Sequence, residues 1–313
     1  MRRADGGAKR EDDMRIEAID VLSGQEAALR APEGTREEVY RQRVDEPLRR
    51  FWEPMMRYMP GGAAGGDDAP SGTALLGFYG PGGDAGEGLD ALAKLRDAGS
   101  PGACVAALEE AARALAPEEH GVSVESVAFS LALADPRLRD LTERNRGYTG
   151  FGGMMGYAAV LVWPDGYNLP RLPSISVHEL HHNVRLAFEP WTQGTTVGQY
   201  VVLEGLAEAF AAEAVGEELL GPWPNALSEG ELEEARPVFR DALEVSGFDE
   251  IRGYVFGDWA ASRFGYVPRG LPDFAGYAMG YRIVREYLDR TGSTAAEATY
   301  VPWREIVDGA RYL

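Results

Sequence analysis

Residues 174–185 read SISVHELHHNVR and place two histidines, His178 and His182, four positions apart, with Glu179 directly after the first. On a helix, positions i and i+4 lie on one face, so both imidazoles can reach the same metal ion. Glu179 then lies beside the metal, where its carboxylate can take a proton from a metal-bound water. Apolar residues at 177, 180, 184 and 186 and a Pro-Ser start at 173–174 favour a helix. The stretch therefore predicts a metal-binding helix.

A histidine-rich surface turn or a pair of buried core histidines would give the same letters. The chain has only four histidines, however, and three of them fall within residues 178–182. This concentration favours the metal interpretation. His181 points away from the face shared by His178 and His182, so we do not expect it to be a ligand. His120 lies in a loop-like segment and is expected to be solvated.

Two histidines leave a catalytic zinc ion one protein ligand short. Residues 201–212 read VVLEGLAEAFAA, an apolar helical pattern that carries Glu204 and Glu208 at positions i and i+4. Charged groups on so apolar a helix are costly unless they are paired or bound to a metal. We expect Glu204 to be the third ligand and Glu208 to accept the free N–H of a metal-bound histidine. The reverse assignment, and an ordinary amphipathic helix with two exposed glutamates, are the alternatives.

Composition narrows the classes of partner. The 313 residues carry a net charge of −19, which argues against a nucleic-acid partner and disfavours binding to anionic membranes. The single cysteine, Cys104, excludes an internal disulfide and a cysteine-based metal cluster. No apolar run reaches about 18 residues, and the N-terminus has no apolar segment typical of a secretion signal. A cytoplasmic protein of unknown oligomeric state is expected.

The chain is expected to have three parts: a disordered leader at 1–13, a mainly helical region at 14–120, and a catalytic domain at 121–313. A capping box at 35–38 predicts a helix to about residue 50, and Gly-rich residues 61–72 predict a flexible linker and 81–88 a second loop. Strands are predicted at 127–134 and 157–163. The Gly-rich residues 147–153 lack the Lys and the Ser/Thr of a phosphate-binding loop, so we expect a tight hairpin or a close backbone approach. Its strand could lie along the cleft and pair with an extended peptide.

The pattern at 178–182, followed by EGLAE at 204–208, resembles the glutamate-zincins, metallopeptidases whose third zinc ligand is a glutamate on a second helix. The resemblance implies Glu204 as that ligand, although the spacing from His182 is a few residues longer than the common one. HELHHNVR at 178–185, the GFGG hairpin at 150–153, EGLAE and GYxxGY at 276–281 resemble the YjaZ-like family of bacterial predicted zinc-dependent proteases. This likeness covers about residues 14–313, and it implies a zincin-like fold and peptidase activity without naming a substrate.

Amide hydrolysis also needs a donor for the developing oxyanion. Tyr277 and Tyr281 share a helix face near the end of the chain, and a tyrosine from a later helix has this role in related zincins. We expect Tyr277 to be the donor, with packing tyrosines as the alternative. Arg185 is expected to form a structural ion pair, with Glu208 or another carboxylate, and substrate binding is its alternative role.

The sequence thus predicts an α+β protein with a zincin-like fold: a small twisted sheet packed on the metal helix, with mainly helical N- and C-terminal segments. Zn²⁺ held by His178, His182 and Glu204 would serve hydrolysis of a peptide or protein substrate, with Glu179 as general base. A zinc hydrolase of a non-peptide amide or ester is one alternative. A non-catalytic protein with a structural zinc site is the other.

Overall fold

The computed structural model describes residues 14–56 and 72–313. The predicted leader, and all of the predicted linker except Gly72, lie outside these residues. A four-stranded sheet has the order β1-β2-β4-β3, and its strands are β1 (Arg15–Ile19), β2 (Ser126–Leu133), β3 (Tyr148–Phe151) and β4 (Tyr157–Val162). β1, β2 and β4 are parallel, whereas β3 runs antiparallel to β4 at the edge of the sheet.

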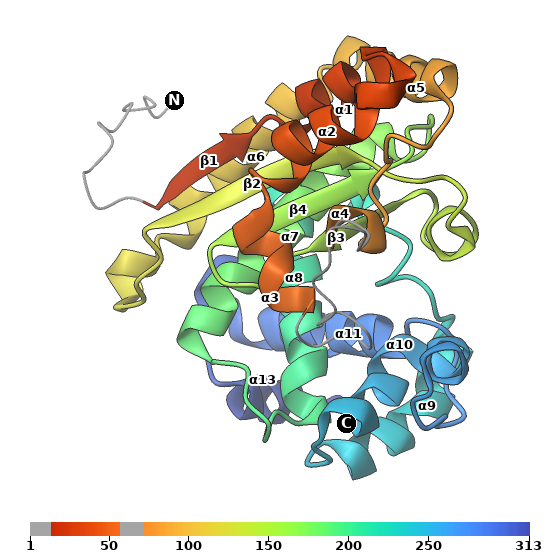
Figure 1. The fold of residues 1–313 in the computed structure, drawn as a ribbon. Coiled ribbons are helices and arrows are strands. Elements are labelled where there is room, and N and C mark those ends of the chain that lie inside the picture. Colours follow the sequence, from red (N-terminus) through yellow and green to blue (C-terminus); the bar gives the residue numbers. More distant parts are fainter. Residues whose placement is uncertain (1–13, 57–71) are drawn as a thin grey trace.

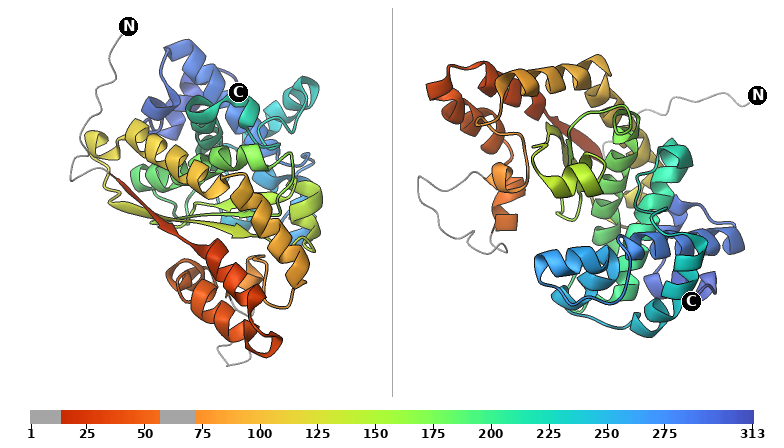
Figure 2. Two further views of the ribbon diagram at one scale, coloured as in Figure 1. Left: turned by 90° about the horizontal axis from the view of Figure 1, so that it is seen from above. Right: turned by 90° about the vertical axis from the view of Figure 1, so that its right-hand side faces the viewer.

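Helices cover both faces of the sheet, as Figure 1 and Figure 2 show. Alternate residues of β2 and β4, such as Phe129 and Val160, face a large core shared with α6 and α7. The opposite set, including Ala132 and Leu161, packs with a smaller cluster around Tyr40 and Phe51. Burial on both faces explains why β2 and β4 read as nearly continuous apolar runs. The helices before β2 are α1 (Val21–Arg30), α2 (Arg36–Tyr40), α3 (Arg49–Met56), α4 (Gly72–Leu75), α5 (Ala85–Asp97) and α6 (Ser100–Leu115).

The remaining helices build the half of the molecule below the sheet in Figure 1. They are α7 (Leu172–Phe188), α8 (Val197–Val215), α9 (Glu229–Ala242), α10 (Phe248–Phe264), α11 (Ala275–Thr291), α12 (Ala295–Ala298) and α13 (Trp303–Ala310). α7 contacts β4 and α6 on one side and α8 on the other, and α11 packs against α8. The sequence predicted to bind a metal therefore lies between the sheet and the C-terminal helices.

Gly205 and Gly280 bring α8 and α11 together. A Cβ on Gly280 would overlap the Val201 carbonyl oxygen, and one on Gly205 would overlap the Gly280 carbonyl group. Two larger residues at this crossing would force the helices apart. The glycine in EGLAE thus sets the position of α11 and of Tyr277 on it.

The α+β class and the two central strands are confirmed. The capping box predicted at 35–38 is wrong, because the Thr35 hydroxyl donates to the Pro32 carbonyl and caps no backbone N–H. The loop predicted at 81–88 is too long, because Asp84 accepts a hydrogen bond from the Glu87 N–H and starts α5 at Ala85. β1 pairs with β2, so residues on both sides of the division predicted at 120/121 share one sheet. In the two described ranges, no helix combines the length and apolar character needed to cross a membrane.

Candidate metal centre

Three buried side chains from two helices converge on one point. His178 and His182 extend from α7, and Glu204 extends from α8. Glu204 Oε2 lies 3.3 Å from His178 Nε2 and 3.4 Å from His182 Nε2. A tetrahedral ion with bonds of about 2.0–2.2 Å separates its ligand atoms by roughly 3.4 Å. The spacing and the nitrogen and oxygen donors therefore fit a zinc ion.

The state of Glu204 also fits a cation. Glu204 Oε2 is buried and has no well-aligned hydrogen bond from any residue that the structure describes. Burial alone would raise the pKa of Glu204, but the adjacent His182 and His178 outweigh burial and lower this pKa to about 2. A buried, ionised oxygen without a donor is costly unless a positive charge accompanies it.

Glu208 lies one turn further along α8 and faces the other nitrogen of the first histidine. Its Oε1 is 3.3 Å from His178 Nδ1. Burial lowers the pKa of His178, yet Glu208 and Glu204 outweigh burial and raise this pKa well above its usual range. A carboxylate at Nδ1 favours the tautomer that leaves Nε2 free as a metal ligand.

Glu179 lies between α7 and the edge strand of the sheet. It is buried, and burial raises its pKa, while His178 and His182 oppose that rise. A Cβ on Gly150 would overlap the Glu179 carboxylate, and one on Gly152 would overlap the Glu179 carbonyl oxygen. The Gly-rich segment is thus a hairpin, as predicted, and its glycines let β3 approach Glu179 closely.

Asn183 connects this hairpin to α7. Its amide donates to the carbonyls of Gly152 at 3.0 Å and Tyr157 at 2.8 Å. Its Oδ1 accepts from the Gly156 N–H at 2.7 Å. The sequence analysis missed this role, because the three partners lie more than twenty residues away in the chain. Asn183 lies among the polar residues of HHNVR at 181–185, so nothing local sets it apart.

The two candidate tyrosines on α11 differ in their surroundings. Burial raises the pKa of Tyr277 well above its usual range, and the carboxylates of Glu204 and Glu179 raise it further, so the charges of these carboxylates reach its phenol. The Tyr281 hydroxyl instead donates to Glu217 Oε1 at 3.2 Å.

Tyr200, one turn before Glu204, was missed by the sequence analysis. Burial raises its pKa and Glu204 adds to the rise, so it too lies near the carboxylates.

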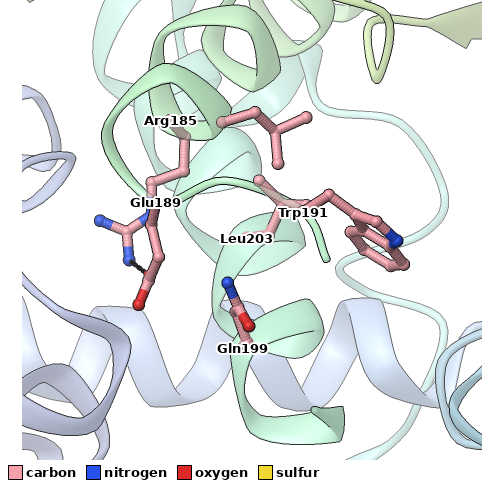
Figure 3. A pocket seen from close by; sticks show the side chains of 6 residues that line it. Arg185, Glu189, Trp191, Gln199 and Leu203 are labelled. Atoms are coloured by element: carbon pink, nitrogen blue, oxygen red, sulfur yellow. Dashed lines mark hydrogen bonds and ion pairs between the residues drawn. The ribbon is translucent and has the colours of Figure 1, made fainter. Parts of the chain in front are cut away.

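Arg185 forms a structural ion pair, but with Glu189 and not with Glu208. Its guanidinium also donates to the carbonyls of Thr299 and Val301, at 2.6 and 2.7 Å. The Arg185–Glu189 pair forms one side of the small pocket in Figure 3, which Trp191, Gln199 and Leu203 also line. Leu203, which lines this pocket, directly precedes Glu204 on α8.

The other two histidines lie apart from the three converging side chains. His181 Nε2 lies 3.0 Å from Thr299 Oγ1. The ring of His120, which is exposed, stacks on Tyr300 with the ring centres 3.8 Å apart.

Comparison with known proteins places this geometry in context. The family model described as "Predicted Zn-dependent protease (DUF2268)" matches residues 103–308. The chain is 36% identical over 276 residues to "Uncharacterized protein YjfC" of Bacillus subtilis (strain 168), covering 88% of this chain and 91% of that protein. No solved structure matches the chain.

Proposed function

This chain belongs to the family of predicted Zn-dependent proteases, and we propose that it is a zinc metallopeptidase that cuts peptide or protein substrates. The observation that carries the proposal is the convergence of His178, His182 and Glu204 with Glu179 beside them. We propose these three side chains as the zinc ligands. Two histidines and a glutamate are a ligand set typical of catalytic zinc, which keeps one position open.

Bound zinc would supply a Lewis acid that polarises a carbonyl and lowers the pKa of water. The chain's own groups have the remaining tasks. Glu179 would accept the proton of the attacking water and deliver it to the leaving amine. The Tyr277 hydroxyl would donate a hydrogen bond to the oxygen that becomes negative during attack. Glu208 would hold His178 in the tautomer and orientation that present Nε2.

The edge strand suggests how a substrate is held. Among the residues that the structure describes, β3 pairs only with β4, and its glycines place its backbone directly against Glu179. An extended peptide would pair with the side of β3 opposite β4, which would bring its carbonyl groups past Glu179. An antiparallel edge strand over the metal helix also supports a zincin-like fold, which we include in the proposal.

The test compares the wild-type protein with Glu179→Gln. Both proteins are loaded with zinc, their metal content is measured by atomic spectroscopy, and a mixed peptide library is digested and read by mass spectrometry. We expect both to hold one zinc and only the wild type to cut. Zinc in both with no cutting by either would contradict the peptidase proposal and favour a structural zinc or a non-peptide amide or ester substrate. Cutting by both would contradict the role of Glu179.

A further inference from the structure

Arg252 on α10 is a half-buried cation that forms no ion pair with any residue that the structure describes. Its Nε is buried and makes no hydrogen bond to any residue within 14–56 or 72–313. Other half-buried arginines have partners: Arg144 binds Asp273, and Arg171 donates to backbone carbonyls. The Nε of Arg269 also makes no hydrogen bond within the described residues, but its Nη2 binds Glu250. In a chain with 50 acidic residues, an unpaired arginine at this depth is unexpected.

Aromatic rings surround the Arg252 guanidinium. Its carbon lies 3.8 Å from the ring centre of Phe248, 5.6 Å from that of Tyr266 and 5.9 Å from that of Phe256. Ring faces attract the charge, but they accept none of its five N–H groups in a directed hydrogen bond. The aromatic collar of Phe248, Phe256 and Tyr266 therefore holds a positive charge and leaves its donors free.

The aromatic collar connects Arg252 to the candidate metal centre. The Phe256 ring centre lies 6.0 Å from that of Tyr200 and 6.1 Å from that of Tyr277. Burial raises the pKa of Tyr200, Glu204 raises it further, and the charge of Arg252 lowers it, so the phenol lies within reach of both charges. α10 also packs against α8 and α11 (Figure 1).

We propose that Arg252 binds a carboxylate of the substrate and makes the enzyme selective for peptides that carry one. The inference rests on the proposed peptidase function and adds the class of substrate. A guanidinium fork matches a carboxylate with two parallel hydrogen bonds, and partial desolvation strengthens them. Glu179, Glu204 and Glu208 carry one more negative charge than a bound Zn²⁺ would neutralise, so a further cation nearby favours the approach of a substrate anion. The carboxylate belongs either to an Asp or Glu side chain or to the C-terminus of the peptide.

The experiment separates binding from cutting. Alanine-based peptides, blocked at both ends, carry one Glu or one Gln at each position in turn, and an all-alanine peptide has either a free carboxylate or an amide at its C-terminus. Calorimetry measures how each peptide binds to zinc-loaded protein that carries Glu179→Gln. Three such proteins are compared: one with Arg252 intact, one with Arg252→Gln in addition, and one with Arg252→Lys in addition. Cutting of the same peptides is measured with Glu179 intact. Arg263→Gln removes the same charge from an exposed position on α10 and is the matched control.

We expect one carboxylate peptide to bind and react about 10- to 100-fold better than its amide partner, as charged hydrogen bonds commonly provide. Arg252→Gln should abolish this ratio by weakening the carboxylate peptide, Arg252→Lys should keep part of the ratio, and Arg263→Gln should keep all of it. The preferred pair identifies a side-chain or a C-terminal carboxylate. Cutting with no carboxylate preference, or a preference that Arg252→Gln leaves intact, overturns the inference and leaves the peptidase proposal standing. Selective binding through Arg252 without cutting would support the carboxylate site and contradict the peptidase proposal.

Discussion

Glu208 Oε1 lies 3.3 Å from His178 Nδ1, on the side of the imidazole opposite the nitrogen that faces Glu204. The two glutamates are one helical turn apart on α8, so a single helix contacts both nitrogens of the same histidine. Glu204 thus lies among the three side chains that would hold zinc, whereas Glu208 lies on the far side of the His178 ring. The loss of Glu204 and the loss of Glu208 should therefore affect zinc affinity to different extents.

Glu204→Ala should prevent tight zinc binding, because it removes one of three proposed ligands and leaves only two imidazoles. The measurement is competition for zinc against a chromophoric chelator, with circular dichroism to check that the variant is folded. A folded Glu204→Ala protein with wild-type zinc affinity would contradict the ligand assignment.

Glu208→Gln should weaken zinc binding by about 10- to 100-fold, the usual cost of losing a carboxylate behind a metal-bound histidine. It should therefore bind zinc more tightly than Glu204→Ala under the same competition assay. Glu218→Gln is the charge-matched control, because Glu218 is exposed and lies beyond the end of α8. Equal effects of Glu208→Gln and Glu218→Gln would show that net charge, and not the contact with His178, determines the affinity.

Gly150→Ala should lower the free energy of unfolding by about 1–3 kcal/mol, as overpacking in a filled core does, because its Cβ would overlap the Glu179 carboxylate. Activity should fall further than stability, because β3 or Glu179 must move to make room. Gly153→Ala is the matched control from the same segment, since a Cβ there would meet no heavy atom within 4 Å. Urea unfolding and peptide hydrolysis measure the two effects. Similar results for both glycines would contradict the close approach of β3 to Glu179.

Tyr277→Phe should lower kcat by about 10²- to 10³-fold with zinc affinity unchanged, which is the typical effect of removing one donor to a developing oxyanion. Tyr281→Phe removes a hydroxyl that donates to Glu217, so its kcat should stay close to that of the wild type. Steady-state kinetics of both variants on one peptide would test the choice between them. A larger loss in Tyr281→Phe would reverse the assignment.

The parts of the fold that the sequence could predict are those with local causes. The patterns at 178–182 and 204–208 predict which side chains share one face of α7 and one face of α8. The apolar runs in β2 and β4 follow from burial on both faces of the sheet. The structure has a capping box at the start of α9, where the Ser228 side chain accepts from the Glu231 N–H and the Glu231 side chain returns the hydrogen bond. At Thr35 the same pattern failed, since Glu38 pairs with Arg41 instead.

The contacts that the sequence could not predict join residues far apart in the chain. Asn183 binds the hairpin at 152–157, and Arg252 approaches Tyr200 from a different helix. Gly205 looked like part of a motif, but its position against Gly280 depends on how α8 and α11 cross. Such pairings follow from tertiary packing and have no periodic signal in the sequence.

Arg185→Met should destabilise the protein by about 3–5 kcal/mol, the usual cost of breaking a buried ion pair from one side. Methionine keeps most of the apolar stem but leaves the Thr299 and Val301 carbonyls and Glu189 without the guanidinium. Burial lowers the pKa of Arg185 to about 10 against the opposing effect of Glu189, so the side chain is charged at neutral pH.

Arg30→Met is the control, since Arg30 is 64% exposed and its ion pair with Glu26 should contribute less than about 1 kcal/mol. Urea unfolding compares the two variants, and a small loss for Arg185→Met would mean that water or a rearranged side chain satisfies these groups. Full stability combined with lost peptide binding would instead favour the alternative role of Arg185 as a substrate ligand at the pocket in Figure 3.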